Sequence, residues 1–278
     1  MPINLAAKFE SKTSDLLFTE RKTKLVTNQD YTWDGVNAIS VYTLLDPVMG
    51  NYNSAGGANR YGNPTEVEDT VQLFTLSRDR SWTKTIDKSN YQDTQMIRKP
   101  AKYLAQATRN ILVPEIDTYI IASLVTAGTT ADRDDIVADA ATTAANAYVN
   151  FTLINADITN RSGPMEGRIA LATPAFVAFL KQSTLFDSSD VGLADRKSGV
   201  VAKMDGVKIV QVPSTRFPAN TDLVITHPSV CVAPEKLIDY TLHSNAPGIS
   251  GDLLEYRHRY DAFVDTNKVN CIGIHRTA

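Results

Sequence analysis

The sequence predicts an α+β protein, and three observations carry this prediction. Residues 69–87 contain no Gly or Pro, and Val, Leu, Phe, Thr, Trp and Ile recur in them as they do in strands. Residues 93–127 carry apolar side chains at seven-residue intervals, which favours one long helix with a single face toward a core. From residue 168 onward, short strand-like and helix-like segments alternate with turns.

The strand-like residues 69–87 are long for the size of the chain. Extended, they would span roughly 60 Å, whereas a compact globule of this length has a diameter of about 50 Å. We therefore expect them to pair with residues 36–45 in a two-stranded ribbon that projects from the body. Gly and Asn residues between the two strands form the predicted tip: Gly50, Asn51, Asn53, Gly56, Gly57, Asn59, Gly62 and Asn63.

A projecting ribbon needs a surface to rest on, because two strands alone are marginally stable in water. Another copy of the protein is the expected surface. Inter-subunit contacts are predicted for aromatic and charged residues of the ribbon and for a basic cluster near the N-terminus: Tyr52, Arg60, Tyr61, Arg78, Arg80, Trp82, Lys84, Arg21 and Lys24. The alternative is that Tyr52, Tyr61 and Trp82 pack against the body of their own subunit.

The remaining elements follow from periodicity and turn residues. A short helix is possible over residues 4–17, and Pro100 and Pro114 should kink or split the long helix before it stops at Gly128. A second helix is expected from Ile136 to Ile154, and Asp205-Gly206 should form a tight turn. The other predicted segments are strand 168–172, helix 174–182, a polar loop 183–198, and strands 199–203, 207–212, 223–226, 229–233, 237–243, 253–264 and 268–275.

The composition of the chain limits its binding partners and its cellular compartment. Lys+Arg 28 against Asp+Glu 31 gives a net charge of -3, so no global attraction to nucleic acid or to an anionic membrane is expected. Charges at Lys8, Glu10 and Lys12 argue against a signal peptide, and the longest charge-free run, residues 140–156, is too rich in Thr and Asn to span a bilayer. We expect a cytosolic protein, and Cys231 and Cys271 to remain free thiols.

The sequence gives little support for a catalytic site or a metal site. His227, Cys231, His243 and His258 lack the two close ligand pairs of a structural zinc site. The chain has no G-x-S-x-G, no P-loop and no G-x-G-x-x-G motif. The basic clusters Arg257-His258-Arg259 and Arg21 to Lys24 are interpreted as inter-subunit partners in preference to phosphate sites. The sequence therefore predicts a non-enzymatic protein without cofactors or metals; the alternative from another class is a cytosolic oligomeric α+β enzyme.

Several stretches resemble the major capsid proteins of tailed bacteriophages with the Hong Kong 97 type of fold. They are MPINLAAKFESK at the start, NRYGNPTEVEDTVQLFTLSRDRSWTKTIDK in the predicted arm, VPEIDTYIIASL in the long helix, and GRIALATPAFVAFLK, DGVKIVQVPSTRFPA, LVITHPSV and APEKLIDYTLHSNAPGISGDLLEYRHRYDAFV further on. Their order carries the resemblance, which covers nearly the whole chain.

The resemblance implies a domain plan. Residues 1–35 would be an N-terminal arm and residues 36–90 an extended loop lying across a neighbour. A peripheral domain with the spine helix would comprise residues 91–130 and 235–268, with that helix facing the interior. An axial domain would comprise residues 131–234 and 269–278, with residues 187–198 at the capsomer axis.

The implied function is structural. The resemblance implies subunits that form hexamers and pentamers of an icosahedral virion shell around double-stranded DNA, assembled in the host cytoplasm without a membrane. The DNA would be held without sequence specificity, and the partners would be a portal and possible decoration proteins. Fewer than forty residues precede the first predicted strand, so any scaffolding protein would be separate, and no motif for covalent cross-linking is evident. An encapsulin-like compartment shell is the alternative within the structural class.

Overall fold

The computed structural model describes residues 21–28, 38–88, 100–133, 141–182, 200–244 and 246–277. The chain divides into two compact units, one formed by Thr32–Ser77 and the other by Met1–Tyr31 together with Arg78–Ala278. The expected helix over residues 4–17 and the expected loop 183–198 lie outside the described residues.

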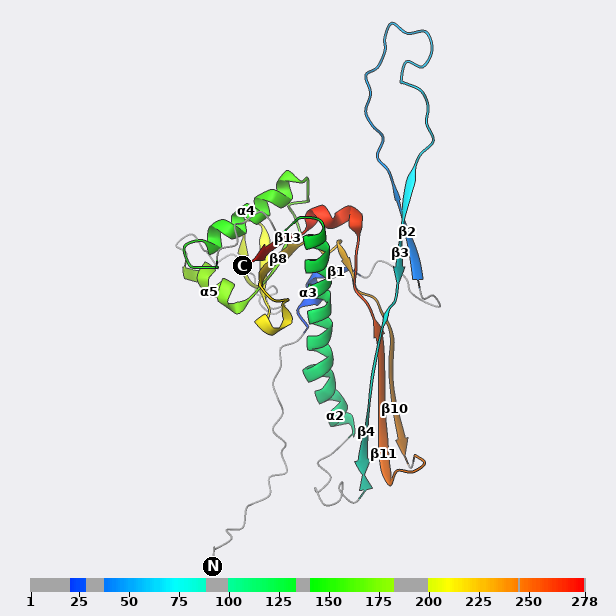
Figure 1. Ribbon diagram of the computed structural model, residues 1–278, viewed down its shortest axis with the longest axis vertical. Coiled ribbons are helices and arrows are strands. Elements are labelled where there is room, and N and C mark those ends of the chain that lie inside the picture. The colour runs from blue at the N-terminus through cyan, green and yellow to red at the C-terminus, as the bar shows by residue number, and fades with distance from the viewer. Residues whose placement is uncertain are drawn as a thin grey trace, which may run out of the picture. The chain divides into compact units, whose positions relative to one another are not determined.

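The smaller unit is an antiparallel two-stranded ribbon with a long tip (Figure 1). Its strands are β2 (Ala38–Leu44) and β3 (Asp69–Thr75), paired in a register that places Tyr42 opposite Val71. The predicted ribbon is thus confirmed for its first strand and for the first half of its second. The predicted second strand is too long, because β3 ends at Thr75.

The second half of the predicted ribbon strand belongs to a different sheet. Strand β4 (Arg78–Asp87) follows the break at residues 76–77 and pairs with β11 (Gly251–Tyr260), which pairs in turn with β10 (Glu235–Ser244). The prediction of one continuous ribbon strand over residues 69–87 is therefore wrong. The partner of β4 lies far downstream in the chain, and strand propensity does not specify which edge a strand will join.

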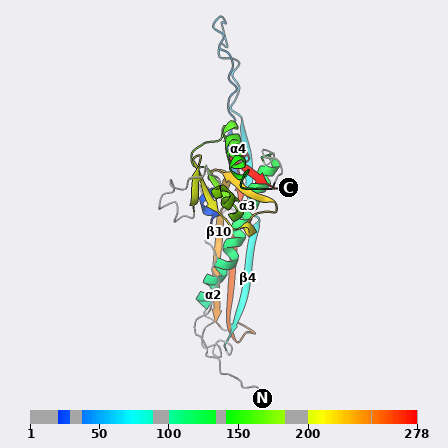
Figure 2. The same ribbon diagram turned by 90° about the vertical axis from the view of Figure 1, so that its left-hand side faces the viewer.

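The long helix covers one face of this three-stranded sheet (Figures 1 and 2). It consists of α2 (Pro100–Ala107), a π-helical turn η2 (Thr108–Leu112) and α3 (Val113–Thr130). Pro100 is the first residue of α2, and Pro114 is the second residue of α3, two positions after the π-helical turn ends at Leu112. A proline ring clashes with the carbonyl four residues earlier, and the wider turn relieves this clash.

Gly128 does not stop the helix, although the sequence predicts that it does. A Cβ atom at Gly128 would lie 2.3 Å from Ile274 Cδ1 and 3.0 Å from Ile272 Cγ2. The glycine therefore allows α3 to approach the C-terminal strand closely, and the helix continues to Thr130.

The C-terminal part contains a five-stranded mixed sheet in the order β13-β8-β5-β7-β6. Asp205 and Gly206 have φ of 47° and 79°, so the predicted tight turn between β6 and β7 is confirmed. The elements are α4 (Ala147–Asn160), β5 (Ile169–Ala172), α5 (Pro174–Gln182), β6 (Val200–Met204), β7 (Val207–Gln211), η3 (Ser214–Arg216), β8 (Thr221–Thr226), η4 (Thr266–Cys271) and β13 (Gly273–Arg276).

A third small sheet brings the N-terminal segment onto the body. Strand β1 (Thr27–Asn28), which follows η1 (Thr23–Val26), pairs in parallel with β9 (Cys231–Val232), and β9 pairs with β12 (Phe263–Val264).

Several predicted boundaries are wrong. The helix expected from Ile136 starts at Ala147, Ile136 itself lying outside the described residues. The strand expected over 253–264 splits into β11 and β12, and the one expected over 268–275 is a 3-10 helix as far as Cys271.

Two apolar clusters form the core of the larger unit. One gathers Ile116, Ile120 and Leu124 of α3 with residues of the mixed sheet and of β9. The other packs α4 and α5 against the mixed sheet through Phe151 and Phe176. By length and composition the helical stretch Tyr103–Thr130 meets the criterion for a membrane span, but the core helices of globular proteins meet it too, and this one contributes to the first cluster.

Candidate inter-subunit surfaces and the N-terminal anchor

The tip of the ribbon is an internally bonded loop. The Asn53 side-chain oxygen accepts hydrogen bonds from the backbone N–H groups of Ala55 and Gly56, at 3.1 and 3.0 Å. Arg60 donates from Nε to the Gly56 carbonyl at 2.6 Å, and the Tyr52 and Tyr61 rings meet edge to face with centroids 5.0 Å apart. Three predicted contact residues, Tyr52, Arg60 and Tyr61, thus lie together in one small structure.

One face of the ribbon is apolar and exposed. Cross-strand register places Tyr42 opposite Val71, and Leu44 and Leu73 lie two positions from them on the same face. The exposed fractions of these side chains are 68% for Tyr42, 69% for Leu44, 55% for Val71 and 63% for Leu73. Contiguous exposed apolar side chains are typical of interaction sites. We call these four residues the ribbon face.

The predicted contact residues of β4 already have partners in their own subunit. Trp82 stacks on Tyr256 at 5.6 Å and meets Tyr103 edge to face at 5.8 Å. Arg80 donates from Nε to a Glu115 carboxylate oxygen at 2.7 Å. For Trp82 the structure thus shows the alternative in which an aromatic packs against its own body.

The other two β4 residues differ from each other. The guanidinium of Arg78 lies 4.2 Å above the centre of the Tyr119 ring and 4.0 Å from Glu115, so it has cation-π and ionic partners within the subunit. Lys84 is exposed opposite Leu254. The assignment of Arg78, Arg80, Trp82 and Lys84 to inter-subunit contacts stays a prediction.

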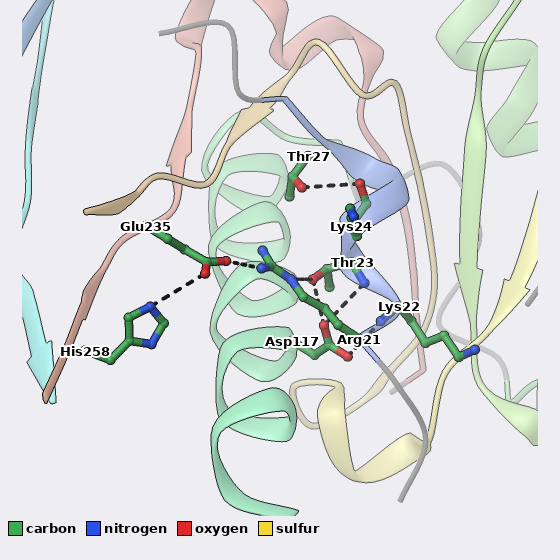
Figure 3. A network of polar contacts seen from close by, with 8 residues as sticks. All are labelled: Arg21, Lys22, Thr23, Lys24, Thr27, Asp117, Glu235 and His258. Atoms are coloured by element: carbon green, nitrogen blue, oxygen red, sulfur yellow. Dashed lines mark hydrogen bonds and ion pairs between the residues drawn. The ribbon is translucent and has the colours of Figure 1, made fainter. Parts of the chain in front are cut away.

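A buried carboxylate on α3 fastens the N-terminal segment (Figure 3). Asp117, which is fully buried, accepts hydrogen bonds from the Lys22 and Thr23 backbone N–H groups at 3.1 and 3.3 Å and from the Thr23 hydroxyl at 2.7 Å. It also forms an ion pair with the buried Arg216 at 2.5 Å. A buried charge needs such partners, because an unpaired one is strongly unfavourable.

A second polar cluster lies beside this anchor and contains Arg21, one of the predicted contact residues. Arg21 pairs through Nη1 with Glu235 Oε1 at the start of β10, and the other Glu235 oxygen faces His258 Nε2 of β11 at 3.6 Å (Figure 3). The neighbouring His258 and the positive charge of Arg21 lower the pKa of Glu235 to about 2. Lys24 is exposed, and its backbone carbonyl accepts from the Thr27 hydroxyl at 3.5 Å.

Sequence reasoning missed the central residues of both clusters. Asp117 carried a usable signal, since it lies one position after Ile116 and three before Ile120, on the apolar side of a helix. A carboxylate there predicts a buried partner. Glu235 carried no comparable signal, because its partners come from distant parts of the chain.

The described residues contain no cluster of metal-binding side chains. No three His, Cys, Asp or Glu side chains among them lie close enough to hold a metal ion. Cys231 and Cys271 are free thiols, and burial raises the pKa of Cys231 to about 12, which keeps that thiol protonated.

No model of a protein family and no curated protein sequence matches the chain. Solved structures do match. A structure from Mycobacterium phage Che8 aligns with a TM-score of 0.72 and 18% identity, over 98% of this chain and 96% of that one.

Two further structures are explicitly capsids. The mature capsid of bacteriophage PhiM1 aligns with a TM-score of 0.73 and 14% identity, over 99% of this chain and 92% of that chain. The capsid of cyanophage P-SCSP1u aligns with a TM-score of 0.70 and 12% identity, over 98% and 93% of the two chains. The chain therefore has the α+β capsid fold of the Hong Kong 97 type, and the fold that the sequence resemblance implied is confirmed.

Proposed function

We propose that this chain is a major capsid protein of a tailed bacteriophage, which assembles into hexamers and pentamers of an icosahedral shell around double-stranded DNA. The observation that carries the proposal is the likeness to phage capsid structures over nearly the whole of both chains. The exposed ribbon face supports it, because a subunit that works alone has no need of such a surface.

The ribbon unit would supply the inter-subunit contacts. In this proposal the ribbon face lies against a neighbouring subunit, and the tip residues Tyr52, Arg60 and Tyr61 reach further along it. Burial of about 1,000 Å² of apolar surface per subunit at roughly 25 cal/mol per Å² corresponds to about 25 kcal/mol before entropy costs. Weak contacts repeated over many copies would then hold the shell without covalent cross-links.

The body of the subunit would supply the rest of the shell. We assign the spine helix and its sheet to a peripheral domain, over residues 91–130 and 235–268, and residues 131–234 and 269–278 to an axial domain. Strand β4 joins the sheet of the peripheral domain through its pairing with β11. Residues 187–198 would face the capsomer axis, and the spine helix would face the packaged DNA without reading its sequence.

The proposal extends to partners and place of assembly. A portal would be a partner, scaffolding and decoration proteins are possible further ones, and assembly would take place in the host cytoplasm. The protein would have no enzymatic activity, since its structural neighbours are shell components.

Deletion of residues 50–62 tests the proposal. The deletion removes the tip and leaves β2 and β3 intact, so the variant should fold and melt like the natural chain yet form no closed shells by electron microscopy and sizing. Gly57→Ala is a matched control, because no atom lies within 4 Å of a Cβ there. Normal shells from the deletion variant would overturn the role of the tip.

Three outcomes for the natural chain bear on the class of protein. Shells or capsomers support the structural class, and shells that contain enzyme cargo instead of DNA would identify an encapsulin-like compartment. Small monodisperse oligomers that a ligand stabilises would contradict the structural class and favour an enzyme.

A further inference from the structure

His258 is an enclosed histidine whose ring nitrogens make no hydrogen bond. Its side chain is 0% exposed, and within the described part of the chain neither Nδ1 nor Nε2 has a hydrogen-bond partner. The rings of Tyr260 and Tyr256 lie 5.1 and 6.3 Å from its ring. The Glu235 carboxylate lies 3.6 Å from Nε2, which is ion-pair distance but longer than a hydrogen bond (Figure 3).

Glu235 is shared between His258 and the N-terminal segment. Its Oε1 is engaged by Arg21, and its Oε2 faces the imidazole. With neutral His258 the cluster is balanced, one carboxylate against one guanidinium. Protonation would place a second positive charge against the same carboxylate, so two cations would then compete for it.

Charged groups on the elements next to β11 and on the N-terminal side have partners of their own. Arg80, opposite His258 in the register of β4, is bound to Glu115 of α3, and Glu115 also accepts from the Tyr260 hydroxyl. On the side of the N-terminal segment, Asp117 of α3 is paired with Arg216 of η3. Protonated His258 would therefore form its ion pair with the Glu235 carboxylate.

We propose that Arg21, Glu235 and His258 form a protonation-dependent latch, which holds the N-terminal segment Arg21–Asn28 on the body while His258 is neutral and loosens it when His258 becomes protonated. A cation on His258 repels Arg21 and gives Glu235 a hydrogen-bonding partner on β11, so the carboxylate turns from the segment toward the sheet. The proposal concerns the isolated chain and stands apart from the proposed assembly.

The direction of the pH effect on detachment of the segment follows from proton linkage. While the segment is attached, a positive charge on His258 would repel Arg21, which engages the same carboxylate. Detachment relieves this repulsion, so uptake of a proton by His258 would favour the detached state, and a fall in pH favours detachment. Glu235 stays ionised throughout this range, because its pKa is lowered to about 2 by its neighbours. Other contacts of the segment, to Asp117 and to β9, would keep detachment partial.

Two backbone amides report directly on the latch. The Lys22 and Thr23 N–H groups donate to Asp117 only while the segment is in place, so their hydrogen exchange measures detachment. The experiment compares the full-length natural chain by NMR at about pH 7.5 and about pH 5, a range that brackets ordinary histidine titration, after correction for intrinsic exchange rates. Two like charges near one carboxylate should lower the protection of these amides by about three- to ten-fold in acid.

Three variants distinguish the proposed latch from a general loss of stability in acid. His258→Gln removes the titrating group and should abolish the change with pH, while Arg21→Gln should give low protection at both pH values. His243→Gln removes an exposed histidine that pairs with Glu255 on the same sheet, and should leave the pH response intact. Thermal melting checks that each variant is folded.

Two results would overturn the proposal. One is protection of Lys22 and Thr23 in the natural chain that stays constant or rises in acid. The other is a folded His258→Gln variant that keeps the full loss of protection, since another group would then be titrating.

Discussion

Glu115 and Asp117 lie two positions apart on α3 and hold different parts of the chain. Glu115 accepts from Arg80 of β4 at 2.7 Å and from the Tyr260 hydroxyl of β11 at 3.1 Å. Asp117 accepts from the Thr23 hydroxyl at 2.7 Å and pairs with Arg216. Two residues correspond to about 200° of rotation on a helix, so the carboxylates point to opposite sides. The first turns of α3 thus join the N-terminal segment to the three-stranded sheet.

Asp117→Asn should destabilise the subunit by roughly 3–5 kcal/mol, because the buried Arg216 would lose its charged partner. Denaturation by urea measures the loss. Glu115→Gln is the matched control on the same helix, and its side chain is partly exposed, so its loss should be about 1 kcal/mol. A change below about 1 kcal/mol for Asp117→Asn would contradict the assignment of this carboxylate as the anchor.

Trp82 and Tyr61 should behave in opposite ways when each is replaced by alanine. Trp82→Ala removes the contacts with Tyr256 and Tyr103 and should lower the free energy of unfolding of the isolated subunit by roughly 2–4 kcal/mol. Tyr61→Ala, whose side chain is 93% exposed, should leave that free energy unchanged and reduce shell formation. Equal stability losses for both variants would refute this distinction.

Gly128→Ala should cost about 1–3 kcal/mol, although alanine favours helices, because the added Cβ would overlap Ile274 and press on Ile272. The same substitution at Gly57, where the space is open, serves as the control in melting experiments. A stabilised Gly128→Ala variant would show that α3 and β13 can separate freely.

Glu235 should make the natural chain sensitive to strong acid. Its folded pKa of about 2 lies below the ordinary 4.5, so its contribution to stability is complete above about pH 4.5 and is lost as the pH falls toward 2. Unfolding free energies measured across this range should fall less steeply for Glu235→Gln than for the natural chain. Identical slopes would mean that the carboxylate gains nothing from Arg21 and His258.

Local sequence signals were sufficient where short-range chemistry decides the structure. The helix Pro174–Gln182 begins at a proline and has the predicted bounds, and the Asp205-Gly206 turn joins the strands that the sequence indicated. The prediction of the second ribbon strand was wrong, because the pairing of strands determines where that strand ends. Residues 69–87 read as one strand, but the chain breaks before Arg78, and β4 pairs with β11.

The candidate sites show the same limit. Tyr52, Arg60 and Tyr61 could be assigned to the tip because they stand in a Gly- and Asn-rich stretch, whose composition alone indicates a loop. Their inter-subunit role stays a prediction. The sequence predicted Arg21 only as an inter-subunit contact. Its ion pair with Glu235, and the bonds of Asp117 to Thr23, join elements that only the folded chain brings together. For Trp82 the sequence left two interpretations open, because an aromatic residue on a strand has no sequence mark that separates a core contact from an interface. The structure shows it packed on Tyr256 and Tyr103.

An electron cryomicroscopy map of the native particle tests the central proposal most directly. We expect Tyr42, Leu44, Val71 and Leu73 of each subunit to lie buried against a neighbouring copy. A particle in which this ribbon face stays open to solvent, or rests only on its own subunit, would contradict it.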